Sequence, residues 1–89
     1  MRPELLTEAS EHAQRAAESA DGEPAERLEN AADALASAVD RERGPDHGWL
    51  AKQTHVLREA AGNAGGDAEE HVADAVECIN EYREDLPGV

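Results

Sequence analysis

Gly44-Pro45-Asp46 lies at the centre of this 89-residue chain and decides how the rest of it is organised. A glycine followed by a proline ends a helix, and aspartate is a favoured residue for capping the start of the next one. On both sides of this break, apolar residues recur at spacings of three and four, which is the pattern of amphipathic helices. The break therefore predicts two halves of similar length, each built from helices.

Each half contains a second break. In the first half it is Asp21-Gly22-Glu23, after which Pro24 suits the first position of a new helix. In the second half it is the stretch 62–66, after which Asp67 caps a helix with Glu70 in a capping-box arrangement. No segment alternates as a strand would. We therefore predict an all-α fold, a single domain over residues 1–89, in which four antiparallel helices form two helical hairpins as an up-down bundle. The helices are expected at about residues 3–20, 24–43, 47–61 and 68–86.

The two halves also resemble each other at an offset of 44 residues. This register pairs Leu6 with Leu50, Ala16 with Ala60, and Gly22 with Gly66, among others. Gene duplication would produce such a match, and so would two alanine-rich hairpins of equal length. Both explanations stay open, and both predict two equivalent hairpins.

The charge is strongly and evenly acidic. The chain carries 21 acidic and 8 basic residues, for a net charge of −13, and Lys52 is the single lysine. Such a surface repels itself at low salt, whereas molar salt shortens the screening length to about 3 Å. Alanine supplies 18 of the 35 hydrophobic residues, so the core is lean. Together these features predict a protein adapted to concentrated salt, and a lean core favours pairing with a second copy or a protein partner.

The same composition indicates the compartment. Cys78 is the only cysteine and cannot form an internal disulfide, and the first residues contain no apolar signal region. No apolar run is longer than Trp49-Leu50-Ala51, which is far too short to span a membrane. We expect a cytoplasmic protein with no membrane association.

Histidines are the first candidates for a metal site. The Glu-x-x-His pattern of di-iron bundles does not occur, but His55 and Glu59 lie four residues apart, as do Glu8 and His12. Each pair is either a two-point metal anchor or two solvated surface residues, and we expect the second. His47 completes the set of candidate ligands. A small-ligand or metal-binding role for these surface pairs is the alternative function, and we assign no metal or cofactor.

The sequence also lacks the motifs for nucleophilic catalysis, phosphate binding and nucleic-acid binding. Cys78 falls between Val76 and Ile79, where a small core or interface residue is expected rather than a nucleophile. The glycine-rich stretch 62–66 is followed by Asp67, whose charge would repel a phosphate. No basic face is available for nucleic acid. The chain is therefore expected not to be an enzyme and not to bind nucleic acid.

Four short stretches resemble a family of small acidic helical proteins of unknown function from halophilic archaea. They are 3–6 (Pro-Glu-Leu-Leu), 16–22 (Ala-Ala-Glu-Ser-Ala-Asp-Gly), 43–48 (Arg-Gly-Pro-Asp-His-Gly) and 81–83 (Glu-Tyr-Arg). The resemblance covers most of the chain, and its motifs are caps and turns. It implies a halophilic archaeal source and a helical domain, and it carries over no catalytic or ligand-binding residue.

The remaining hypothesis is a non-enzymatic interaction or structural module that acts through self-association, as a homodimer, or through a protein partner. The surface would be apolar area that four thin helices leave uncovered. In an up-down bundle the larger apolar side chains gather at one end. We therefore predict an interaction surface made of Trp49, Cys78, Tyr82 and Leu86.

Overall fold

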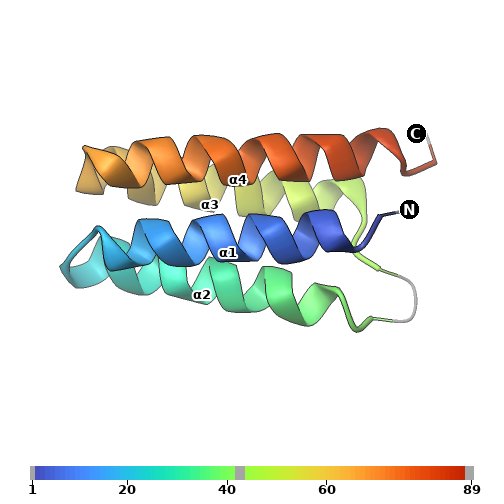
Figure 1. Ribbon diagram of the computed structural model, residues 1–89, viewed down its shortest axis with the longest axis horizontal. Helices are drawn as coiled ribbons and strands as arrows, with labels where there is room; N and C mark the ends of the chain where they lie inside the picture. The colour runs from blue at the N-terminus through green and yellow to red at the C-terminus, as the bar shows by residue number, and fades with distance from the viewer. Residues whose placement is uncertain (1, 42–43, 88–89) are drawn as a thin grey trace.

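The chain folds as a bundle of four α-helices, which confirms the all-α prediction (Figure 1). The computed structural model describes residues 2–41 and 44–87, and these residues contain no strand. The helices are α1 (Glu4–Glu18), α2 (Gly22–Ala38), α3 (His47–Ala64) and α4 (Asp67–Glu84). None of these described helices is long and apolar enough to span a membrane.

The chain reverses direction at each of its three connections, so each helix runs opposite to the one before it (Figure 1). Polar contacts fix the register of the pairs. The Ser10 hydroxyl on α1 donates to the carbonyl oxygen of Ala32 on α2, 2.8 Å away. Arg2 and Asp85, which flank α1 and α4, form an ion pair of 2.8 Å. The bundle therefore closes with α4 against α1.

The central break behaves as predicted. The Asp46 carboxylate accepts a hydrogen bond of 2.8 Å from the backbone N–H of Trp49, which is the capping geometry of a helix N-terminus. Gly44 has a φ of +70°, a conformation that residues with a Cβ rarely adopt. α2 itself ends at Ala38, earlier than expected, and its predicted end at residue 43 lies outside the described residues.

The other helix boundaries differ from the predicted ones by up to three residues. α2 begins at Gly22, two residues before Pro24. α3 continues through Gly62 to Ala64, because an isolated glycine weakens a helix by about 1 kcal/mol without ending it. The reversal comes at Gly65 and Gly66, whose φ angles are +72° and +56°. Gly66 therefore precedes α4 as its N-cap, and the predicted Asp67 cap is absent because Asp67 is already helical.

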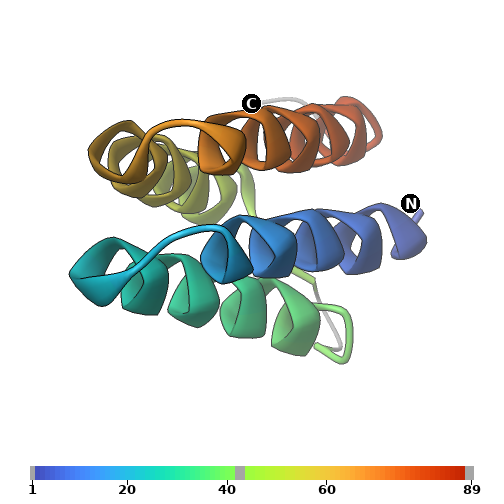
Figure 2. The ribbon, with the colours of Figure 1, turned by 60° about the vertical axis from the view of Figure 1, so that its left-hand side comes forward.

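All four helices contribute alanine to the core, and α1 has its larger buried residues only at its start, whereas the other three helices mix alanine with larger buried residues along their length. The inner face of α1 is mostly alanine, so α1 packs closely along both α2 and α4 (Figures 1 and 2). α3 makes less extensive contacts with its two neighbours. The largest fully buried side chains are Leu6, Leu28, Leu35, Leu50, Leu57 and Ile79.

Candidate interaction groove between α3 and α4

The four residues of the predicted interaction surface lie in different settings. Tyr82 is buried, with 3% of its surface exposed, and burial raises the pKa of its phenol. Trp49 and Leu86 are half-buried against the core. Above the Trp49 ring lies the guanidinium of Arg41, 5.1 Å from the ring centre, in a cation–π contact. Tyr82 is thus committed to the core, and the Trp49 ring is covered in part by Arg41.

Cys78 faces α1 rather than the aromatic residues. Its Sγ lies 4.0 Å from a carboxylate oxygen of Glu8. Burial raises the pKa of the thiol, and the negative charges of Glu8, Glu81, Glu77 and Asp74 raise it further. A reactive cysteine needs the opposite setting, an electropositive one that stabilises the thiolate. Cys78 is therefore placed as a half-buried, weakly reactive thiol.

Two of the candidate histidines, His55 and His47, contact neighbouring side chains. His55 lies 3.2 Å from Glu59, which also accepts a hydrogen bond of 3.0 Å from Arg27 on α2. The Arg27 guanidinium, and to a lesser degree His55, hold the pKa of Glu59 below its usual value. This carboxylate is therefore occupied by a cross-helix ion pair.

His47 links α3 to the end of α4. Arg83 Nε donates to His47 Nδ1 over 3.2 Å, which requires the ring proton to sit on Nε2. That Nε2–H can then donate to the carbonyl oxygen of Pro87, 3.3 Å away. His12 differs, because its Nδ1 is buried without a hydrogen-bond partner among the described residues. Across residues 2–41 and 44–87, no three His, Cys, Asp or Glu side chains are grouped as metal ligands.

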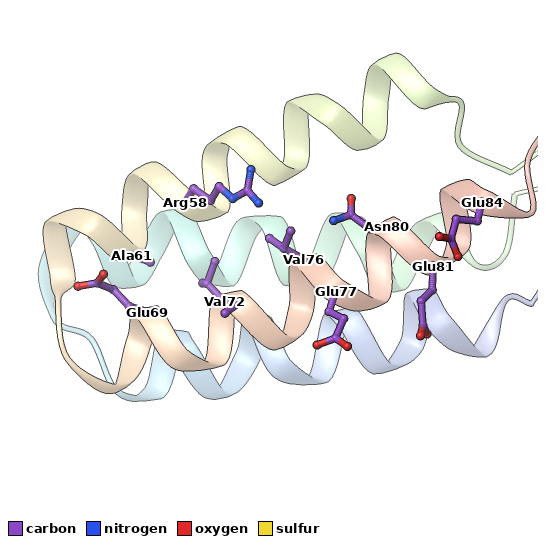
Figure 3. Close-up of a pocket in the computed structure, with 10 residues that line it drawn as sticks. Arg58, Ala61, Glu69, Val72, Val76, Glu77, Asn80, Glu81 and Glu84 are labelled. Carbon is purple, nitrogen blue, oxygen red and sulfur yellow. The ribbon is translucent and has the colours of Figure 1, made fainter. Parts of the chain in front are cut away.

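A groove runs between α3 and α4, with a volume of about 580 Å³. Figure 3 shows the two helices close together near Ala61 and Glu69 and spreading apart toward Glu84. Buried alanines near the connection, among them Ala60, Ala61 and Ala68, allow the two helices to approach closely there.

The floor of the groove is apolar. Val72, Val76 and Asn80 project from α4 toward the α3 side (Figure 3). Ala73 also lines the groove and is exposed. The two valines are almost fully buried, at 3% and 4% exposure, so the open apolar surface is narrow. A hollow of this volume falls within the ~300–1,000 Å³ range of binding pockets, and here it is open along one side.

The walls of the groove are mostly acidic. Four glutamates line it, against one basic residue, Arg58 of α3. Arg58 is exposed and makes no ion pair with any residue that the structure describes. Glu77 and Glu81 project to the far side of α4, where they also line a smaller hollow beside Cys78 (Figure 3). The acidic lining comprises Glu69, Glu77, Glu81 and Glu84.

The sequence contains only part of the signal for this groove. Val72 and Val76 are four residues apart in the sequence, as on one face of a helix, and both are buried. The groove itself depends on the distance between α3 and α4, and the residue pattern of a single helix does not predict that distance. Arg58 is a weak sequence signal for the groove, since it is one of only eight basic residues in a chain with 21 acidic ones.

Comparison with known proteins places the chain in a family without adding a function. No curated protein and no solved structure matches it. One family model does match, over residues 1–85. That match covers all four helices. The chain therefore belongs to DUF7553, a family of unknown function.

Proposed function

We propose that this chain is a non-enzymatic interaction module that binds a second copy or a protein partner through the α3–α4 groove. The groove carries the proposal, because it combines an exposed small residue, Ala73, with a valine floor and charged walls. Grooves between helices commonly receive the apolar face of another helix. α3 is also the helix with less extensive contacts to its neighbours, so a further helix beside it would complete its packing.

The titratable groups support a non-enzymatic role. Catalytic sites tend to gather groups whose pKa values are shifted by burial and by designed charge partners. Among the residues that the structure describes, a clear shift is found for Arg2, Glu59, Cys78 and Tyr82, of which only Cys78 and Tyr82 lie on the same helix. Two of these shifts arise mainly from surface ion pairs, and two from burial. None of the four lines the groove.

The working environment that we propose is a cytoplasm with a high salt concentration, as in halophilic archaea. The net charge of −13 and the alanine-rich core favour it, because salt both screens the surface and strengthens apolar burial. Under these conditions a partner must bind through apolar contact as well as charge. The valine floor of the groove meets that requirement.

Photocrosslinking in the native cell tests the proposed surface. A photoreactive amino acid would replace Ala73 in the groove, and Ala36, an exposed alanine on α2, would serve as the matched control. The proposal predicts a defined adduct from position 73 that is at least several-fold stronger than any from position 36. The mass of the adduct then separates a second copy from a different chain. Equal labelling from the two positions would contradict the groove as the binding surface.

A further inference from the structure

The charges around the groove indicate what kind of helix would occupy it. Glu69 and Glu84 lie near its two ends, and Glu77 and Glu81 lie along the outer ridge of α4. These two ridge residues also line the hollow on the α1 side, and their carboxylates project toward that side of α4 (Figure 3). Any chain lying along α4 would therefore have acidic groups beside it over most of its length.

We infer that the occupant is a basic amphipathic helix from a different chain; this inference rests on the proposed function. Its small apolar side chains would contact Ala73, Val72 and Val76. Lysine or arginine side chains on one edge would reach Glu77 and Glu81 while their methylene stems cover apolar surface. The distance from Glu69 to Glu84 along a helix is about 22 Å, so about 15 residues of the occupant would be in contact.

Arg58 sets the orientation of this helix. Among the described residues that line the groove it is the only basic one, and it stands on the α3 side, opposite the ridge. With no partner among the described residues, its guanidinium is available to a carboxylate. Guanidinium and carboxylate pair in a two-point geometry that fixes direction as well as attraction. The occupant therefore carries basic residues on the edge over α4 and an acidic residue on the edge over α3.

A second copy of this chain fits poorly. Its net charge is also −13, so two copies repel each other at low salt, and at high salt the repulsion is confined to carboxylates that come into close contact. The outward residues of α4 in a second copy would place glutamate against glutamate along the ridge. Like charges facing each other across an interface cost affinity and exclude wrong partners. Charge complementarity thus favours a basic chain over self-association.

Designed peptides test the inference on the intact protein. Three 16-residue helical peptides would share one apolar face and one acidic position, and would carry lysine, glutamine or glutamate along the other edge. Fluorescence anisotropy would measure their binding at the lowest KCl concentration that preserves full helicity. We expect the lysine peptide to bind about tenfold or more tightly than the glutamine peptide, and its affinity to fall with added salt. The glutamate peptide should not bind.

Paired variants of the protein show which glutamates bind the lysine peptide. The double substitution Glu77→Gln/Glu81→Gln should weaken binding of the lysine peptide about tenfold, since each pair contributes a factor of a few. The control Glu11→Gln/Glu18→Gln removes the same charge from exposed positions on α1 and should change binding less than twofold. Arg58→Gln should weaken binding of the lysine peptide, and it should not weaken binding of a lysine peptide whose acidic position is changed to glutamine.

Three outcomes would overturn the inference in different ways. Equal binding of the lysine and glutamine peptides, lost in Ala73→Trp but kept in Ala36→Trp, would leave the groove as an interaction surface and remove its basic partner. Failure of all three peptides to bind would also overturn the inference, while crosslinking from position 73 would still decide the proposed function. Dimer formation that is lost in Ala73→Trp would assign the groove to a second copy instead.

Discussion

Arg83 Nε lies 3.2 Å from His47 Nδ1, so the last turn of α4 is joined directly to the first residue of α3. The bond works only with a neutral imidazole, because Nδ1 must accept. The same ring reaches the carbonyl oxygen of Pro87 through Nε2. Three segments at the wide end of the α3–α4 groove are therefore held by one side chain.

Removing the His47 imidazole should destabilise the wide end of the α3–α4 groove. His47→Ala is expected to lower the free energy of unfolding by about 1 kcal/mol, the net value of one or two partly exposed hydrogen bonds. Urea titration followed by circular dichroism in molar KCl measures the change. His55→Ala is the control, since 76% of the His55 side chain is exposed and its contact with Glu59 is a surface pair. A loss no larger than that of His55→Ala would contradict the structural role of His47.

Thr54 on α3 is the second site where the structure predicts a stability change. It is 8% exposed, and its hydroxyl is buried with no partner among the described residues. Replacing an unsatisfied hydroxyl with a methyl group of the same shape removes a desolvation cost. Thr54→Val should raise the free energy of unfolding by about 1 kcal/mol.

The matched control is Thr7→Val on the exposed face of α1, where the change should stay within about 0.5 kcal/mol of zero. Thermal unfolding in the same salt would compare the two variants. A destabilising Thr54→Val would show that the hydroxyl is satisfied in solution, for example by water.

Cys78 should alkylate slowly in the folded protein. Burial and four neighbouring carboxylates raise the pKa of its thiol, so at any pH below that value less thiolate is present than in the unfolded chain. The rate with iodoacetamide should therefore be several-fold lower at pH 8 in molar KCl than in denaturant, and the pH profile should be displaced upward. Glu8→Gln removes the nearest charge and should speed the reaction, whereas Glu11→Gln should not. A native rate equal to the denatured rate would contradict the raised pKa.

The break at 44–46 shows what local pattern can predict. Gly44, Pro45 and Asp46 each act through their own backbone or cap geometry, so the division into two hairpins and the Asp46 cap follow from the sequence. The position at which α3 ends within residues 62–66 was harder to predict, because a glycine inside a helix and a glycine at its end look alike in the sequence. Only the positive φ angles of Gly65 and Gly66 distinguish them.

The candidate site depended on relationships that no single helix contains. Tyr82 was predicted at an exposed aromatic end, but its ring faces the core, where Gly44 approaches its hydroxyl closely enough that an added Cβ would lie 3.1 Å away. The groove arises from the divergence of α3 and α4 (Figure 3), which depends on packing among all four helices. The glutamates that line the groove could not be identified from the sequence, because the chain contains 21 acidic residues.

Salt should control folding itself. With a net charge of −13 and a lean core, the helices are expected to be largely intact in multi-molar KCl and lost in dilute buffer. Circular dichroism across a KCl titration measures this directly. Fully helical, heat-stable protein in dilute buffer would contradict the adaptation to concentrated salt.

A variant separates charge repulsion from the strengthening of apolar burial by salt. Replacing three exposed glutamates, Glu11, Glu18 and Glu29, with glutamine changes the net charge from −13 to −10 and leaves the core untouched. If repulsion opposes folding, the KCl midpoint of the variant should fall clearly below that of the parent, because less screening is needed. An unchanged midpoint would mean that salt acts on the alanine-rich core, and the acidic surface would then be free to serve recognition at the groove.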